Sequence, residues 1–175
     1  MSSRDADRES RPASDSRVEM TTLVIPEDTN THGNVFGGRV MEIIDKAAAI
    51  AALRHCRAPV VTASVDSLDF IHPVRLGDIL QVVAQVNNAW RTSMEVGAKV
   101  WSEAPLTGER QHTCTAYLTI VALGEEGRPA AVVPSILACS PDEVRRQAAS
   151  RTRRRRRLDR VAARRARVGS TTPSP

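Results

Sequence analysis

The sequence has few cysteines and no long apolar run, and both absences narrow what the protein can be. Only three cysteines occur in 175 residues, at Cys56, Cys114 and Cys139, and none has CxxC spacing. This argues against a disulfide framework and against a zinc site, so we expect free, buried thiols and no metal. The longest apolar stretch, residues 47–53, is too short to cross a bilayer, so no membrane span is expected.

The first 18 residues are polar and carry charges of both signs. They alternate Arg with Asp and Glu, include Ser and Pro, and contain no apolar run that could form the core of a signal peptide. A segment of this kind buries too little apolar surface to offset the entropy lost on ordering. We therefore predict a disordered N-terminal tail over residues 1–18 and a cytoplasmic location.

The net charge of +5 conceals an acidic body and a basic end. Twelve of the 25 basic residues follow position 144, but only one of the 20 acidic residues does, which gives this end +11 and the first 144 residues −6. We interpret residues 141–175 as an Arg-rich segment, partly helical and partly disordered. Because its arginines are not interleaved with aromatic residues, base stacking is unsupported and nucleic acid is not the expected partner. Contact with a polyanion through this segment stays open as an alternative function.

One helix and five strand-like segments can be read between the two ends. Residues 39–53 are rich in Ala, Ile, Leu and Met and are apolar on nearly every side, which indicates a helix enclosed by other structure. In residues 60–70 the strand-like alternation changes parity near Asp66, which predicts a one-residue bulge. The strand-like segments are residues 20–25, 60–70, 79–86, 93–102 and 111–123.

The order of these elements predicts an α+β fold. A strand, an enclosed helix and four further antiparallel strands suit a curved antiparallel β-sheet wrapped around one long central helix. We expect this domain to span residues 19–140. Ser140, followed by Pro and two acidic residues, is typical of a helix N-cap, so a second helix is predicted to start there.

Candidate chemistry gathers at the start of the enclosed helix. Gly37 and Gly38 let a ligand approach the unpaired backbone N–H groups of the first turn, where the helix dipole favours an oxyanion. About two turns further along, Asp45 stands among Ile and Ala residues, where a carboxylate costs free energy unless it is paired or used. A structural carboxylate and a catalytic one both fit this pattern.

A set of separated motifs runs through this part of the chain. They are residues 26–45, which include the two glycines and Asp45, and the segments Arg54-His55-Cys56, Val61-Thr62-Ala63-Ser64-Val65-Asp66, Gly77-Asp78 and Arg91-Thr92-Ser93-Met94-Glu95-Val96. In this order they resemble the hotdog-fold acyl-CoA thioesterases, in the branch that contains the bacterial YciA-like and the cytosolic brain-type acyl-CoA hydrolases. The resemblance covers about residues 20–133 and leaves both ends of the chain outside.

The resemblance implies an enzyme that hydrolyses the thioester of a fatty acyl-CoA to the free acid and CoA. It implies that Asn30 and Asp45 are catalytic and that Gly37, Gly38 and Thr62 bind the substrate or stabilise the oxyanion. Asp45 would act as a general base toward water or as a nucleophile, and no metal or organic cofactor is required. The implied CoA contacts are Arg54, Arg91, Thr92 and Ser93.

The same resemblance implies self-association. Two such units pair edge to edge into a continuous sheet and place the substrate cleft between them. We therefore expect a dimer or a trimer of dimers, with Asn30 of one subunit facing Asp45 of the other. A non-catalytic hotdog module that binds acyl-CoA is a further alternative, against which the intact Asn30 and Asp45 argue. The sequence leaves the length of the acyl chain open.

Overall fold

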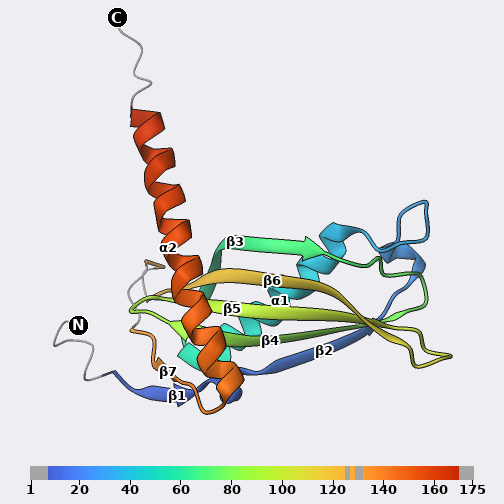
Figure 1. Cartoon of the computed structure of the whole chain (residues 1–175), viewed down its shortest axis with the longest axis horizontal. Coiled ribbons are helices and arrows are strands. Elements are labelled where there is room, and N and C mark those ends of the chain that lie inside the picture. The colour runs from blue at the N-terminus through green and yellow to red at the C-terminus, as the bar shows by residue number, and fades with distance from the viewer. Residues whose placement is uncertain (1–7, 125–126, 129–131, 170–175) are drawn as a thin grey trace, which may run out of the picture.

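A five-stranded antiparallel sheet curves around one long helix (Figure 1). The computed structural model describes residues 8–124, 127–128 and 132–169. The helix is α1 (Gly37–Cys56), and it lies along one face of the sheet. The predicted α+β hotdog fold is confirmed. In their order across the sheet, the strands are β2 (Val18–Leu23), β4 (Ile79–Ala89), β5 (Ser93–Glu103), β6 (Arg110–Ala122) and β3 (Val60–Phe70).

Helix α1 turns only one of its sides to the sheet, although its sequence is apolar almost all round. Met41, Ile50 and Leu53 stay 42%, 38% and 42% exposed on the other side. The prediction of an enclosed helix is therefore wrong for the single chain, because one curved sheet covers one face of a helix. The buried residues, which recur every three or four positions, are Val40, Ile43, Ile44, Ala47, Ala48, Ala51, Ala52 and His55.

Strand β3 contains two bulges where the sequence predicts one. Its register with β6 shifts between Thr62 and Ser64 and again between Val65 and Ser67, so the strand has an extra residue at each place. The bulge predicted near Asp66 is confirmed. Each bulge reverses the alternation of the strand, so three residues spaced three apart face α1. These inner residues are Thr62, Val65 and Leu68.

The N-terminal segment is ordered well before the predicted boundary at residue 18. Strand β1 (Ser10–Pro12) pairs in parallel with β7 (Ser135–Leu137), and a 3-10 helix, η2 (Ala13–Ser16), follows it. Ser16 is fully buried, and its hydroxyl accepts a hydrogen bond from the Val86 amide of β4 at 3.0 Å. The structure thus corrects the predicted disordered tail over residues 8–18, because backbone groups far away in the chain satisfy its polar side chains. Residues 1–7 lie outside the described residues.

A second long helix, α2 (Pro141–Gly169), crosses the outer face of the sheet, opposite α1 (Figure 1). It begins at the position predicted from Ser140. The Ser140 hydroxyl accepts a hydrogen bond from the Glu143 amide at 3.3 Å, and the Glu143 carboxylate accepts one from the Ser140 amide at 3.1 Å. This reciprocal pair satisfies two amides that the helix itself leaves without partners.

Helix α2 is held to the sheet by polar side chains. Four residues along one side of the helix, at positions 143, 150, 153 and 157, each meet a polar partner on the sheet. The helix predicted within residues 141–175 is confirmed over residues 141–169, whereas its docking on the sheet was not predicted from its composition. The pairs are Glu143 with Gln85, Ser150 with Asn88, Arg153 with Glu95, and Arg157 with Thr119 and Asp66.

None of the described helices is long and apolar enough to cross a membrane. The three cysteines are free, as expected, but they differ in burial. Cys114 is buried, Cys56 is half-buried and Cys139 is exposed, so the expectation of buried thiols is wrong for Cys139.

The ring of His55 is enclosed where α1 ends. Its Nε2 lies 2.9 Å from the Pro134 carbonyl, whereas Nδ1 has no hydrogen-bond partner among the described residues. Burial lowers the pKa of His55 below its usual 6.5; the hydrogen bond to Pro134 opposes this, and the charges of Arg11 and Arg8 add to the lowering. The folded protein therefore holds a neutral imidazole that donates through Nε2.

We expect the free energy of unfolding to fall as the pH drops below 6.5, because the unfolded chain then protonates His55 more readily than the folded chain does. The stability that comes from keeping His55 neutral is fully present above pH 6.5 and is lost as the pH falls to the lowered pKa. The loss is about 1.4 kcal/mol for each unit by which folding lowers the pKa of His55. Urea unfolding at about pH 7.5, 6 and 5 measures this decline. In His55→Gln, whose amide can still donate to Pro134, the decline should be smaller. Equal declines in the two proteins would contradict the assignment.

Candidate active site

A hollow of about 350 Å³ opens between the first half of α1 and the inner face of β3 and β6. Its volume falls within the roughly 300 to 1,000 Å³ typical of small-molecule sites. Apolar side chains form most of its wall, and its polar members are Glu42, Asp45 and Thr62. The residues that line it are Gly38, Met41, Glu42, Ile44, Asp45, Thr62, Val65, Leu68, Ala116 and Leu118.

Asp45 and Thr62 are hydrogen-bonded to each other on the wall of this hollow. Thr62 lies on the inner face of β3, and its hydroxyl donates to Asp45 Oδ1 at 2.6 Å. Asp45 is exposed in the single chain, so the predicted apolar enclosure of this carboxylate is wrong: it lies on the uncovered side of α1. Thr62 holds one carboxylate oxygen and leaves the other to accept a proton from a water molecule.

Glu42 is the second carboxylate in the hollow, and it is committed to ion pairs. Its oxygens accept hydrogen bonds from Lys46 Nζ at 2.5 Å and from Arg39 Nη1 at 2.7 Å. These hydrogen bonds, that of Lys46 first and that of Arg39 next, lower the pKa of Glu42 to about 2. Because a carboxylate paired in this way is a weak base, Asp45 is the better candidate for taking a proton.

The first turn of α1 leaves backbone donors unpaired. The Arg39 and Val40 amides both donate to the Phe36 carbonyl, at 2.9 and 3.2 Å, so the amides of Gly37 and Gly38 come before the first hydrogen bonds of the helix. A Cβ added at Gly38 would meet nothing within 4 Å, and one at Gly37 would lie in ordinary contact with the Phe70 ring at 3.4 Å. The surrounding protein therefore does not require glycine here, and the open space suits the close approach of a ligand to the amides.

Asn30 lies outside the hollow, in the loop that precedes α1. Its side-chain oxygen accepts hydrogen bonds from the amides of His32 at 2.9 Å and Asn34 at 3.2 Å, which forms a tight Asx turn. Since the oxygen is engaged, the side-chain NH₂ is the group left to donate to a ligand. The single chain brings Gly38, Asp45 and Thr62 together but does not bring Asn30 to them.

The candidate CoA-binding residues lie at the far end of α1. Arg54 is in the last turn, about 14 Å along the helix axis from Asp45. The other three, Arg91, Thr92 and Ser93, lie where β4 turns into β5. The Val133 amide donates to the Arg91 carbonyl at 3.0 Å, and the adjacent Pro134 contacts His55 next to Arg54, so both groups lie at one end of the molecule. An extended ligand could reach from the hollow to this end.

The apolar lining of the hollow includes residues that sequence reasoning misses. Val65 and Leu68 share a face with Thr62 only because of the two bulges, and the change of parity within β3 is the signal that points to them. Met41 precedes Asp45 by one helical turn, so its position follows from helix geometry. No three His, Cys, Asp or Glu side chains gather as a metal site would require within the described ranges.

Comparison with known proteins places the chain in a family. A family model described as the thioesterase superfamily matches residues 32–109. The uncharacterized acyl-CoA thioester hydrolase YkhA of Bacillus subtilis (strain 168) is 42% identical over 136 residues, which cover 78% of this chain and 78% of that protein. The chain belongs to the thioesterase superfamily. This membership confirms the family inferred from the sequence motifs.

Solved structures of superfamily members share the fold of this chain. An apo-hexameric acyl-CoA thioesterase is 42% identical with a TM-score of 0.85, and the match covers 88% of this chain and 98% of that one. An acyl-CoA hydrolase from Staphylococcus aureus is 37% identical with a TM-score of 0.85, covering 92% of this chain and 98% of that one. It was solved in complex with butyryl coenzyme A, coenzyme A and coenzyme A disulfide.

Three variants of the Staphylococcus aureus enzyme have also been solved, and each replaces one residue by alanine: an asparagine, an aspartate and a threonine. In that enzyme, 15 positions separate the asparagine from the aspartate and 17 separate the aspartate from the threonine. Asn30, Asp45 and Thr62 have the same two separations in this chain. The correspondence singles out the two residues of the hydrogen-bonded pair and the asparagine that lies away from it.

Proposed function

We propose that this chain is an acyl-CoA thioesterase that hydrolyses the thioester in the hollow between α1 and β3. The observation that carries the proposal is the hydrogen bond from Thr62 to Asp45 on the wall of an apolar hollow, beside the open first turn of α1. Apolar residues would take the acyl chain, and the far end of α1 with Arg54 and Arg91 would take the phosphates of CoA. Superfamily members named acyl-CoA thioester hydrolases, one of them solved with CoA ligands, support this assignment.

In the proposed reaction Asp45 acts as the general base. Its free carboxylate oxygen takes a proton from water while the water oxygen attacks the thioester carbonyl carbon. The amides of Gly37 and Gly38 stabilise the resulting oxyanion, a contribution of roughly 3 to 4 kcal/mol per donor. When the intermediate collapses, the C–S bond breaks and the CoA sulfur leaves as thiolate, to which Asp45 can return the proton. Only groups of the chain and one water molecule are needed, so we propose that no metal or organic cofactor takes part.

We favour the general base over the nucleophile because Thr62 fixes only one oxygen of Asp45, at 2.6 Å. The second oxygen can bind a water molecule without forming a covalent intermediate. Asn30 would orient this water or the carbonyl through its side-chain NH₂. The equal spacing of the three residues substituted in the Staphylococcus aureus enzyme supports the choice of Asn30, Asp45 and Thr62 as residues of the site.

The site we propose is completed by a second copy of the chain. Strand β3 is an edge strand of 11 residues, and an edge of this length is a ready surface for pairing. Val61 on this strand and Ile50 and Leu53 on α1 are exposed apolar residues that a partner would cover. Since Asn30 does not reach the hollow of its own chain, it would reach that of its partner. The hexameric state of a superfamily member is consistent with a trimer of dimers.

The two alternatives explain fewer of these observations. A non-catalytic acyl-CoA-binding module would not need the hydrogen-bonded Asp45 and Thr62. Polyanion binding by α2 would use arginines of which Arg153 and Arg157 already face carboxylates of the sheet. The cytoplasmic location expected from the sequence remains a prediction.

Thioester hydrolysis by the purified full chain tests the proposal. Acyl-CoAs of increasing chain length are supplied, and released CoA thiol is measured against acyl-CoA consumed. We expect saturable turnover with one thiol released per acyl-CoA, and the chain length with the highest kcat/KM gives the depth of the hollow in the assembly. Binding of acyl-CoA at every length without thiol release would identify a non-catalytic module instead.

We also expect two inactive variants to restore activity to each other. If each site takes Asn30 from one subunit and Asp45 from the other, a heterodimer of Asn30→Ala and Asp45→Ala chains has one doubly defective site and one intact site. Random pairing of equal amounts yields about a quarter of the wild-type number of sites. Co-refolded mixtures are assayed for thiol release, with heterodimers quantified by two affinity tags.

The control mixes Asp45→Ala chains with Thr62→Ala chains. Asp45 and Thr62 belong to the same hollow of one chain, so a heterodimer of these variants has one defect in each of its two sites and regenerates no intact one. Complementation in the control and not in the Asn30 mixture would contradict the shared site. So would heterodimers that form in the Asn30 mixture but remain inactive.

A further inference from the structure

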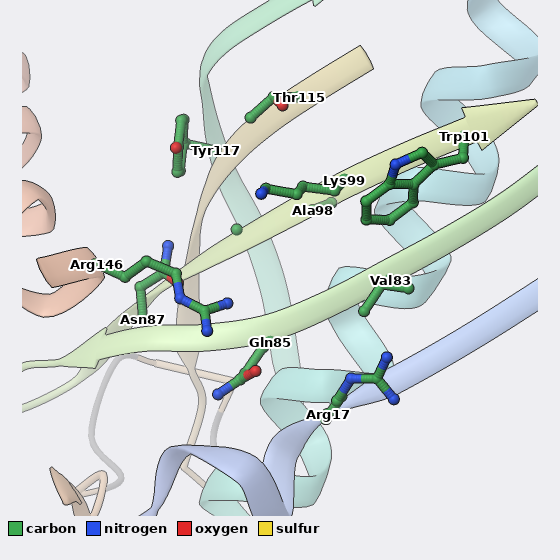
Figure 2. A pocket seen from close by; sticks show the side chains of 11 residues that line it. Arg17, Val83, Gln85, Asn87, Ala98, Lys99, Trp101, Thr115, Tyr117 and Arg146 are labelled. Carbon is green, nitrogen blue, oxygen red and sulfur yellow. The ribbon is translucent and has the colours of Figure 1, made fainter. Parts of the chain in front are cut away.

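A second hollow, of about 230 Å³, lies on the outer face of the sheet, on the side of the sheet opposite α1 (Figure 2). Its floor is formed by outward-facing residues of β4, β5 and β6, and its rim by the start of β2 and the first turns of α2. Since α1 and the proposed active site lie across the sheet, this hollow is separate from them. The residues that line it are Arg17, Val83, Gln85, Asn87, Gly97, Ala98, Lys99, Trp101, Thr115, Tyr117 and Arg146.

Cations from three different elements surround this hollow. Arg17 precedes β2, Lys99 is on β5 and Arg146 is on α2, and none of the described lining residues is an Asp or Glu. Figure 2 shows the guanidinium groups of Arg17 and Arg146 extending toward β4 from either side, with Lys99 on the neighbouring strand. Three positive charges that line one hollow, with no acid in the lining, favour an anionic ligand.

Each of the three cations keeps part of its charged group available to a ligand. Arg17 pairs with Glu19 at 3.1 Å, but half of its side chain stays exposed. Arg146 uses its Nε to donate to the Asp142 carbonyl at 3.3 Å, which leaves its two terminal nitrogens for a ligand. Lys99 is exposed, so its ammonium group can turn toward a ligand. A phosphate group has enough acceptor oxygens to bind all three side chains at once.

The floor of the hollow is kept flat by a glycine. A Cβ added at Gly97 would lie 2.6 Å from Asn87 Nδ2, so no side chain can stand there while Asn87 keeps its place. Asn87 is held by a hydrogen bond from Nδ2 to Glu95 at 3.1 Å. Also on β5, Trp101 presents an aromatic ring to the hollow (Figure 2). The Arg110 guanidinium lies over that ring, 4.7 Å from its centroid. The hollow thus combines positive charge with a ring on which a planar group can pack.

We propose that this hollow binds a small phosphorylated metabolite, with its phosphate on Arg17, Lys99 and Arg146 and a single planar ring against Trp101. Its volume of about 230 Å³ is below the roughly 300 to 1,000 Å³ of most small-molecule sites, so we propose a ligand smaller than CoA. A nucleoside monophosphate has the required phosphate and ring. Because one wall is α2, occupancy of the hollow would tie this helix more firmly to the sheet.

Tryptophan fluorescence offers a direct test with AMP as the probe. The chain has two tryptophans, so Trp90→Phe leaves Trp101 as the only one. In this full-length variant we expect AMP to change the Trp101 emission in a saturable way. Adenosine, which lacks the phosphate, should bind at least about tenfold more weakly, because it forms none of the charge-assisted hydrogen bonds with the three cations.

Two adjacent arginines of α2 provide the matched control. Arg146→Gln, combined with Trp90→Phe, should weaken AMP binding about tenfold, and Lys99→Gln should do the same. Arg145→Gln removes the same charge one residue away, from a side chain that is 69% exposed, pairs with Asp142 and does not line the hollow. It should change AMP binding by less than about twofold.

Four outcomes would overturn the proposal. No saturable emission change means that the hollow does not bind the probe. Equal effects of Arg145→Gln and Arg146→Gln mean that net charge alone attracts it. Equal affinities for inorganic phosphate and AMP mean that the ring of AMP makes no favourable contact with Trp101. AMP binding that is displaced by CoA and unaffected by Arg146→Gln places AMP in the acyl-CoA site. Thioester hydrolysis by Arg146→Gln is measured alongside, and it should match that of the parent protein.

Discussion

Replacing Asp45 by Asn should lower kcat for acyl-CoA hydrolysis by roughly 100- to 10,000-fold, the usual contribution of a general base. The amide has the shape of the carboxylate but cannot take a proton from water. Asp45 is exposed and its hydrogen bond is with Thr62, so the variant should fold as the parent does. KM should change much less than kcat, because the lost interaction belongs to the transition state.

The matched control is Glu42→Gln, one turn earlier on α1. Glu42 also lines the hollow, but its carboxylate is engaged by Lys46 and Arg39. This variant removes the same charge from the same helix and should keep kcat within a few fold. If the two variants lose similar activity, the effect is electrostatic and Asp45 is not the base. A fully active Asp45→Asn protein would refute the mechanism itself.

Arg153→Ala should lower the free energy of unfolding by about 3 kcal/mol, the cost of leaving a buried carboxylate without its partner. Arg153 donates to both oxygens of Glu95, at 2.6 and 3.1 Å, and the Glu95 side chain is 2% exposed. The guanidinium also lies 3.7 Å from the centroid of the Tyr117 ring. Its removal should therefore loosen α2 from the sheet. Urea unfolding measures the change.

Two companion variants separate this ion pair from the general charge of α2. Arg155 is exposed on the same helix, so Arg155→Ala should change stability by less than about 0.5 kcal/mol. Adding Glu95→Gln to Arg153→Ala removes the unpaired charge, so the double variant should recover much of the loss. Equal stabilities of the Arg153 and Arg155 variants would show that α2 is a solvated end.

Local patterns in the sequence were sufficient to predict the main helices and strands. The apolar run after Gly37 predicts α1, the alternation of single segments predicts β3 to β6, and the sequence after Ser140 predicts the start of α2. Asp45 and the two glycines stand out because a carboxylate and a glycine pair are unusual at the start of an apolar helix. These properties depend on residues close together in the chain, and periodicity and capping record them directly.

Contacts between distant parts of the chain decided which polar segments are ordered and which residues meet in the site. Ser16 is buried because its hydroxyl accepts the hydrogen bond that the Val86 amide donates. Helix α2 docks because Glu95 and Asp66 face its arginines. Neither can be read from composition, since a polar segment becomes ordered only where the fold supplies matching polar groups. In the same way, the two bulges of β3 decide that Thr62 meets Asp45. The sequence by itself therefore determined which residues could be catalytic. Only the tertiary structure decided which of them share a site, because the hydrogen bond between Asp45 and Thr62, which are 17 residues apart, depends on the register of β3.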